Sequence, residues 1–259
     1  ILKFVLSVFV MIIHSGIDKT IISPLLRTAV PLFFIASSYF FFIKINNLTN
    51  REEKNRSLIR FVKRNLLLYL FWTVVQLPIV VYTRGYFNNF FSSGIFSVFK
   101  DCILGKGFLG SWYIIASVIG IVAVFLTSRI MSAKCQVLIT FPLYIICCLA
   151  TNYRNILNAN SIFIMITDGY YELTELYFYT SFPVALFWVS VGRFCAETKT
   201  KIKDGAFFVL CIIFSVLLVF ERYIILEFNL AITDDCYFML SLLCPVIFLI
   251  FSKYNFNFI

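Results

Sequence analysis

Long apolar runs separated by short polar stretches constrain this 259-residue chain more than any other feature of its sequence. Hydrophobic residues make up 61% of the chain and charged residues 14%, whereas soluble domains carry about 25% charged residues. The runs lack the alternation of polar and apolar residues that strands of an outer-membrane barrel show. Since lipid offers no hydrogen-bond partners to the backbone, such runs cross it as helices. We therefore predict an all-α protein, a polytopic bundle of transmembrane helices.

The apolar runs predict about eight spans in a single membrane domain that covers residues 1–259. No internal repeat or low-complexity linker divides the chain. The chain starts with Ile1, and its first run is short for a span of about 20 residues, so we expect the N-terminal part to be truncated. To within a few residues, the spans are 1–16, 25–45, 61–82, 109–130, 135–151, 181–195, 206–221 and 236–252.

The distribution of Lys and Arg predicts the orientation of the spans, because cytoplasmic loops of membrane proteins are enriched in both residues. Most of the 22 Lys and Arg residues lie in the stretches 44–64, 129–134 and 193–203. With both chain ends in the cytoplasm, all three stretches lie on the cytoplasmic side of a bacterial plasma membrane. The net charge of +9 is therefore interpreted as a topology signal in a protein whose partner is the lipid bilayer, and no nucleic-acid partner is expected.

His14 is the only histidine of the chain, and it follows Lys3 by eleven positions within an apolar run. At about 100° and about 1.5 Å per residue, the two side chains share one stripe of a helix and lie roughly 16 Å apart. Ionisable residues inside a membrane are costly and commonly functional. Because imidazole exchanges protons near neutral pH, His14 is a candidate general base for a hydroxyl nucleophile. The alternative is a histidine that only hydrogen-bonds a neighbouring helix.

A basic cluster precedes the third span. Its positions, i, i+4, i+7 and i+8, fall on one face of a helix that enters the membrane. Such a cluster could hold the phosphates of a cytosolic, nucleotide-bearing donor. The alternative is a cluster that sets topology and contacts anionic lipid headgroups. The cluster consists of Arg56, Arg60, Lys63 and Arg64.

Four further residues are candidates for the site. Arg27, at the outer mouth of the second span, is expected near His14 and could stabilise developing negative charge, or it could extend to lipid headgroups. Trp112 and Tyr113, at the start of the fourth span, form part of a substrate site or an aromatic belt. Glu221, at the outer end of the seventh span, is a candidate catalytic carboxylate, the partner of an internal ion pair or a structural anchor.

Two long irregular segments, 83–109 and 151–180, are predicted on the outer side, where long loops are commonly functional. Their aromatic and polar side chains suit a carbohydrate-like acceptor, and they suit an interfacial belt equally well. The eight cysteines form no CxxC pair and read mostly as small buried hydrophobes. Cys102 and Cys236 could both lie outside and pair. With one histidine and dispersed cysteines, no metal site is expected.

Taken together, these residues resemble the acyltransferase-3 family of membrane acyltransferases. Members carry an Arg or Lys, ten intervening residues and a His in the first span, as Lys3 and His14 do here. The resemblance covers most of the chain, although family members usually have about ten spans and the last two have no counterpart here. The remaining similar stretches are 29–39, 60–64, 111–113, 182–192, and Glu221 followed by 235–237.

The resemblance implies a transmembrane acyl transfer. Acetyl-CoA would bind from the cytosol as the donor, with Lys3 and the basic cluster holding its phosphates. His14 would deprotonate a hydroxyl of a glycan or lipid-linked glycan acceptor at the cell envelope, and Arg27 would stabilise the oxyanion. A second reading is a transporter-type domain that handles a small substrate such as serine, because some similar domains are fused to amino-acid racemases.

Overall fold

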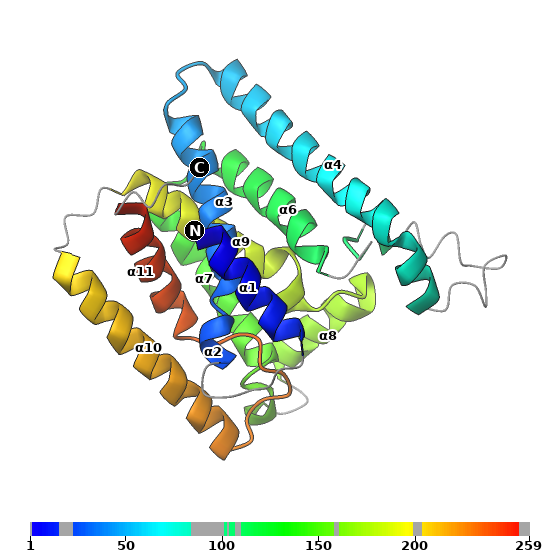
Figure 1. Ribbon diagram of the computed structural model, residues 1–259, viewed down its shortest axis with the longest axis vertical. Coiled ribbons are helices and arrows are strands. Elements are labelled where there is room, and N and C mark those ends of the chain that lie inside the picture. Colours follow the sequence, from blue (N-terminus) through cyan, green and yellow to red (C-terminus); the bar gives the residue numbers. More distant parts are fainter. Residues whose placement is uncertain are drawn as a thin grey trace.

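The chain folds into helices only, in the part that the structure describes (Figure 1). The structure is a computed structural model that describes residues 2–15, 23–83, 101–102, 104–106, 110–157, 161–198 and 204–253. Two short 3-10 turns, η3 (Arg154–Ile156) and η4 (Phe178–Thr180), join the longer elements. The α-helices are α1 (Leu2–His14), α2 (Ser23–Leu26), α3 (Ala29–Asn46), α4 (Arg51–Thr83), α6 (Trp112–Thr127), α7 (Ala133–Ala150), α8 (Ile162–Thr174), α9 (Phe182–Glu197), α10 (Asp204–Glu227) and α11 (Leu240–Lys253).

The predicted all-α class is confirmed, and each predicted span overlaps a helix. Four helical segments are long and apolar enough to cross a membrane, namely Ser23–Asn46, Arg51–Tyr82, Ala133–Ala150 and Gly205–Glu227. The remaining helices at predicted spans are shorter, so the number of spans and the side of each terminus stay predictions. The outer segment 151–180 contains the additional helix α8, whereas residues 84–100 of the segment 83–109 lie outside the described residues.

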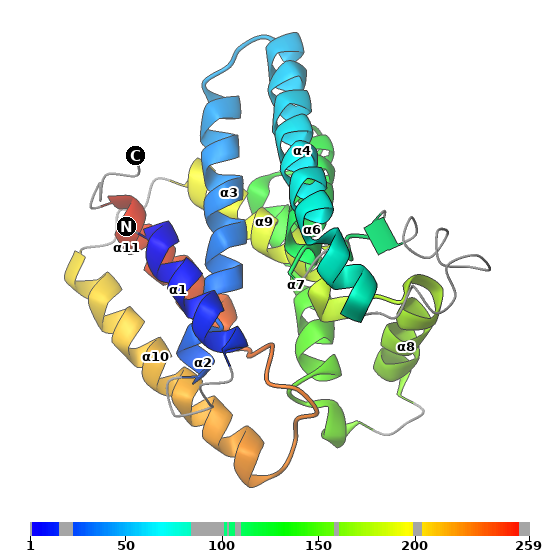
Figure 2. The same cartoon turned by 45° about the vertical axis from the view of Figure 1, so that its right-hand side comes forward.

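Helix α9 forms the centre of the bundle, with α3, α6 and α7 packed around it (Figures 1 and 2). Lipid tails are as apolar as the side chains, so helices in membranes associate through close packing and interhelical hydrogen bonds. Both occur where α3 meets α9. Ser38 Oγ donates a 2.6 Å hydrogen bond to the carbonyl oxygen of Val189. Gly192 lies so close to α3 that an added Cβ would sit 2.5 Å from the carbonyl oxygen of Ile35.

Contacts between connecting segments occur at both ends of the bundle. At one end of the bundle, Arg129 Nη2 donates to Asn55 Oδ1 at 3.0 Å, joining the α6–α7 connection to the start of α4. At the opposite end, Arg27 pairs with Asp235 and joins the α2–α3 turn to the segment before α11. Figure 2 shows the α3–α4 connection and the α10–α11 connection at opposite ends. We refer to the first as the basic end and to the second as the acidic end.

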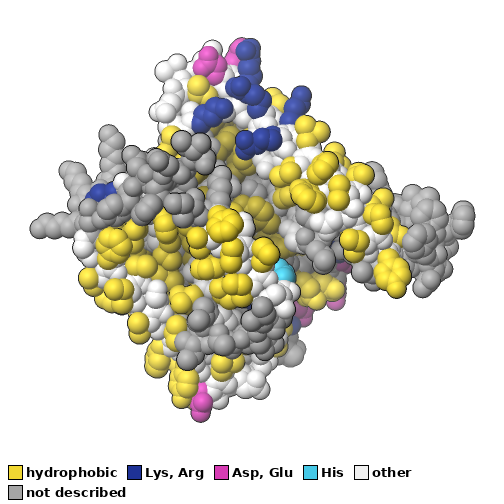
Figure 3. All heavy atoms as spheres, viewed as in Figure 1, with side chains coloured by type: hydrophobic (Ala, Val, Ile, Leu, Met, Phe, Trp, Pro, Cys, Tyr) yellow, Lys and Arg dark blue, Asp and Glu magenta, His cyan; other side chains and the backbone are white. Residues whose placement is uncertain are grey.

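Helix α4 carries the basic cluster and the third predicted span on one continuous helix of 33 residues. At about 1.5 Å per residue it is about 50 Å long, which exceeds the roughly 30 Å of a bilayer core. Lys and Arg side chains gather over its first turns, and hydrophobic side chains cover the rest (Figure 3). The length of α4 therefore lets its basic start project from the membrane.

Replacing Gly192 tests the α3–α9 contact. In Gly192→Ala the new methyl group has no room against the backbone of Ile35, so we expect a loss of about 1–3 kcal/mol and a lower melting temperature in detergent. The matched control is Gly169→Ala in α8, where an added Cβ meets nothing within 4 Å. Equal melting temperatures for the two variants would contradict the packing described here.

Candidate functional site

A cavity of about 180 Å³ at the acidic end is lined by three ionisable side chains from separate parts of the chain, those of His14, Arg27 and Asp235. His14 comes from the end of α1, Arg27 from the turn between α2 and α3, and Asp235 from the segment before α11. The predicted proximity of His14 and Arg27 is thereby confirmed. The other lining residues are mainly apolar or aromatic: Val10, Ile13, Val30, Pro31, Trp112, Tyr144, Tyr179, Thr180, Val184, Trp188, Cys236 and Leu240. We call this space the histidine cavity.

Arg27 and Asp235 form an ion pair in the histidine cavity. Arg27 Nη1 lies 2.7 Å from Asp235 Oδ1, and about a quarter of each side chain is exposed. The backbone N–H groups of Asp235 and Cys236 donate to Asn152 Oδ1 at 3.0 and 3.1 Å. Asn152 is fully buried, so it fixes the backbone that carries Asp235. The pair thus has a defined position instead of being a loose surface contact.

Glu221 anchors the other end of the same segment. Its carboxylate accepts hydrogen bonds from the N–H groups of Phe238 and Met239 at 2.7 and 2.9 Å, and from Tyr153 Oη at 2.6 Å. The two N–H groups immediately precede α11, where a helix start lacks internal partners and favours a negative charge. The carboxylate is not among the residues that line the histidine cavity. Glu221, predicted as a catalytic candidate, therefore positions the segment 232–239.

A second acidic residue of this segment is also held from several directions. Asp234 accepts from Ser23 Oγ at 3.3 Å and from the hydroxyl of Tyr237, and it lies 3.6 Å from Arg222 Nη2. Arg222, the neighbour of Glu221 in the sequence, thus forms an ion pair with Asp234. With Asn152 and Glu221, these contacts fix the segment 232–239 against α2, α7 and α10.

Tyr179 is a further titratable residue of the histidine cavity and lies in η4, outside the long apolar helices. Burial and the nearby Asp235 carboxylate raise the pKa of its phenol, a hydrogen bond with Thr233 lowers it, and the net result is a pKa of about 12. The phenol therefore keeps its proton at physiological pH and can donate a hydrogen bond. The imidazole of His14, which also lines this cavity, is solvent-exposed.

A stack of tyrosines leads from α8 to the histidine cavity. The rings of Tyr171 and Tyr177 stack at 4.9 Å, and those of Tyr177 and Tyr179 stack at 5.5 Å. Tyr171 and Tyr177 are exposed, and Tyr179 lines the cavity. The stack therefore forms an aromatic surface that continues from the outside of the bundle into the cavity.

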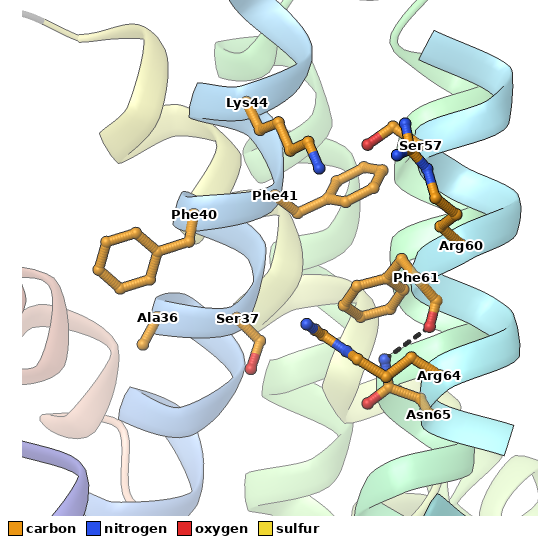
Figure 4. A pocket seen from close by; sticks show the side chains of 10 residues that line it. All are labelled: Ala36, Ser37, Phe40, Phe41, Lys44, Ser57, Arg60, Phe61, Arg64 and Asn65. Carbon is orange, nitrogen blue, oxygen red and sulfur yellow. Dashed lines mark hydrogen bonds between the residues drawn. The ribbon is translucent and has the colours of Figure 1, made fainter. Parts of the chain in front are cut away.

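A second cavity, of about 470 Å³, lies between α3 and α4 (Figure 4). Its three cationic residues are Lys44, Arg60 and Arg64, and the side chains of Lys44 and Arg64 extend into the gap from opposite helices. The rest of the lining consists of Ala36, Ser37, Phe40, Phe41, Ser57, Phe61 and Asn65. We call this space the basic cavity. It concentrates positive charge beside aromatic rings, a combination that suits a phosphate-bearing aromatic ligand.

The predicted basic cluster is only partly at this cavity. Arg60 and Arg64 line it, whereas Arg56 and Lys63 do not. Arg56 pairs instead with Glu52 one turn earlier at 3.3 Å, and both side chains are largely exposed, so this pair contributes little to stability. Arg51 and Lys54 line a different space of about 560 Å³, together with Arg129 and Arg193.

Both named cavities border helix α3 at different heights. Ser37 lines the basic cavity, and Pro31 lines the histidine cavity. The two residues are six positions apart, which corresponds to about 9 Å along the helix axis. Between them, Ser37 Oγ and Tyr113 Oη are hydrogen-bonded at 3.2 Å. The ring of Phe34 lies 4.5 Å from that of Tyr113 and 6.1 Å from that of Trp112. Trp112 thus lines the histidine cavity, and Tyr113 packs between Ser37 and Phe34 beside it.

Several expectations from the sequence need correction or completion. Lys3 lies in α1, but its side chain is outside the described residues. Cys102 and Cys236 are thiols and do not form the disulfide considered above. In the part of the chain that the structure describes, no group of three His, Cys, Asp or Glu side chains could hold a metal ion.

Two residues of these cavities are not predicted as site residues from the sequence. In the sequence, Lys44 indicates only topology, although it faces the basic cluster across the α3–α4 connection. Asp235 stands out there only as part of a motif. The signal that could have singled it out is the pair of adjacent acidic residues, Asp234 and Asp235, just before an apolar run on the predicted outer side.

Comparisons with known proteins give one distant match. No family model matches the chain, and no solved structure matches it. The chain is 25% identical over 263 aligned residues to a protein of Enterococcus faecalis named amino-acid racemase. The match covers 96% of this chain and 34% of that protein, so the chain spans about a third of the length of this curated relative.

Removing the Glu221 carboxylate should release the segment that carries Asp235. In Glu221→Ala, two N–H groups and the Tyr153 hydroxyl lose their acceptor, so we expect faster hydrogen exchange across 232–239 and a loss of about 2–4 kcal/mol of stability. The control is Glu227→Ala on the same helix, where the side chain is exposed. Unchanged exchange in Glu221→Ala would contradict the anchoring role.

Proposed function

We propose that this chain is the membrane domain of an O-acyltransferase, similar to the acyltransferase-3 family. It would move an acetyl group from cytosolic acetyl-CoA to a hydroxyl of an extracytoplasmic glycan or lipid-linked glycan. The observation that carries the proposal is the arrangement of the two cavities in series along α3. The first offers cations to a donor, and the second offers a base and an ion pair to a reacting carbonyl group.

The basic cavity supports the donor site. Lys44, Arg60 and Arg64 present three positive charges within one space, and hydrogen bonds from Lys and Arg to phosphate are strong because both partners are charged. Phe41 and Phe61, whose ring centroids are 5.3 Å apart, supply an aromatic wall for a nucleobase. Lys3, at the start of α1, would add a further cation. In the proposed orientation this end of the bundle faces the cytosol.

The histidine cavity supports the transfer step. His14 accepts the proton of the acceptor hydroxyl, and the hydroxyl oxygen attacks the thioester carbonyl carbon. Arg27, held in place by Asp235 at 2.7 Å, stabilises the negative charge on the carbonyl oxygen. The carbon–sulfur bond then breaks, and the departing thiolate takes the proton from His14. An ester of the acceptor and free CoA result, so atoms and charges balance.

The two sites are close enough for one donor molecule to occupy both. Pro31 and Ser37, which line one cavity each, are about 9 Å apart along α3, and an extended pantetheine arm can span that distance. Trp112 forms part of the wall along which the thioester would lie. The tyrosine stack from Tyr171 to Tyr179 supplies flat apolar faces to a sugar acceptor that approaches from outside.

Binding of acetyl-CoA to the detergent-purified protein tests the donor site. The variant Arg60→Gln/Arg64→Gln loses two charged contacts of about 1.5–3 kcal/mol each. We therefore expect its dissociation constant for acetyl-CoA, measured by isothermal titration calorimetry, to be at least about tenfold higher than that of the wild type. The matched control is Arg51→Gln/Lys54→Gln, which removes two cations of the same helix from another cavity. Equal affinities for both double variants would contradict the assignment of the donor site.

The role of His14 is tested by separating binding from transfer. His14→Ala should bind acetyl-CoA as the wild type does but should lose at least about 100-fold in transfer of radiolabelled acetyl groups to the cell-envelope fraction, as expected for a general base. Wild-type transfer by this variant would remove His14 from the mechanism.

A second candidate function is the handling of a small amino acid such as serine. Two observations favour it: the distant match to a protein named amino-acid racemase, and the Arg27–Asp235 pair, which offers one charge of each sign to a zwitterion. Binding of radiolabelled L-serine by the wild type but not by Arg27→Met, together with no binding of acetyl-CoA, would support this function and contradict the acyltransferase.

A further inference from the structure

The boundary between the two cavities is a small polar and aromatic cluster. Ser37 Oγ lies 3.2 Å from Tyr113 Oη, and the Tyr113 ring also packs against Phe33 at 6.0 Å and Phe34 at 4.5 Å. Ser37 lines the basic cavity, whereas Trp112, the neighbour of Tyr113, lines the histidine cavity. The cluster therefore joins a residue of the basic-cavity lining to the direct neighbour of a residue of the histidine-cavity lining.

The position of Tyr113 is fixed by the start of α6. The preceding residue, Ser111, is buried, and its hydroxyl donates a 2.5 Å hydrogen bond to the carbonyl oxygen of Gly105. The Tyr113 ring is thus anchored through its backbone, while its hydroxyl is held by Ser37. A side chain held in this way can change rotamer without movement of the helix.

We propose that Tyr113, held by Ser37, is a positioning residue that closes the route between the basic cavity and the histidine cavity and is displaced by the donor. The role of the donor in this inference rests on the proposed acyl transfer, whereas the closure itself does not. A closed route keeps water away from a thioester that waits in the histidine cavity. It also prevents a water-filled path from connecting the two sides of the membrane.

The chemistry of the cluster suits displacement by a pantetheine arm. The Ser37 and Tyr113 hydroxyls each carry a donor and an acceptor, and the arm carries two amide groups. When the arm enters, each hydroxyl exchanges its partner for an amide N–H or C=O group. No buried polar group is then left without a partner, so opening exchanges hydrogen bonds instead of losing them.

Natural cysteines of the chain provide a test that does not depend on catalysis. Cys236 lines the histidine cavity, and Cys135 is exposed at the basic end, in the first turn of α7. A charged, membrane-impermeant methanethiosulfonate reagent is applied to sealed inside-out vesicles, and labelling of each cysteine is followed by peptide mass spectrometry. Labelling of Cys135 reports the orientation of the vesicles. The labelling rate of Cys236 in inside-out vesicles is divided by its labelling rate in right-side-out vesicles, which gives the normalised rate.

In the wild type we expect rapid labelling of Cys135 and slow labelling of Cys236 from the cytoplasmic face. Tyr113→Ala should raise the normalised rate at Cys236 at least tenfold, and Ser37→Ala should raise it less, because the ring stays in place. The control is Tyr223→Ala, which removes an exposed tyrosine from α10 and should leave the rate unchanged. Melting temperatures identify any variant that fails to fold.

A folded Tyr113→Ala with the wild-type rate at Cys236 would overturn the closure, as would rapid labelling of Cys236 in the wild type. If the rate rises but the wild type binds no acetyl-CoA, the closure is supported and the acyl transfer fails. If acetyl-CoA binds and the rate does not change, the acyl transfer stands and the closure fails. The two proposals are therefore distinguishable.

Discussion

The close contact between α3 and α9 is the interaction on which the rest of the structure depends. Ser38 donates to the carbonyl oxygen of Val189, and Gly192 lets the backbone of α3 approach without a clash. In lipid, where apolar side chains gain little by leaving the solvent, such small-residue contacts determine which helices associate. Because α3 borders both cavities, the same contact also sets where the basic cavity and the histidine cavity lie relative to one another.

The charges of the molecule follow this arrangement. Cations line the spaces at the basic end, where α4 extends beyond the apolar part of the bundle. At the acidic end, Asn152 and Glu221 hold the segment that presents Asp235 to Arg27. A donor with phosphates and an acceptor without them would thus meet chemically different surfaces. In our account the reaction takes place where the two meet, beside His14.

Much of the fold could be predicted from the sequence because a membrane imposes a simple rule: long apolar runs must become helices. Helical spacing also predicted that Arg60 and Arg64 share a face, and the short loop after His14 predicted its proximity to Arg27. Asp235 and Asn152 could not be found in this way. These two residues are 83 positions apart and are joined by a hydrogen bond. No local spacing in the sequence predicts a contact over that distance. A carboxylate that caps a helix and a catalytic carboxylate look alike in a sequence, so the sequence alone cannot choose between these roles for Glu221.

A structure of the protein determined by electron cryo-microscopy with a non-hydrolysable acetyl-CoA analogue tests the central claim most directly. Our account predicts nucleotide density between α3 and α4, beside Lys44, Arg60 and Arg64, and the acyl end of the analogue beside His14, with the Tyr113 ring turned away from Ser37. Density for the nucleotide at another site, or an acyl end that never reaches the histidine cavity, would contradict it.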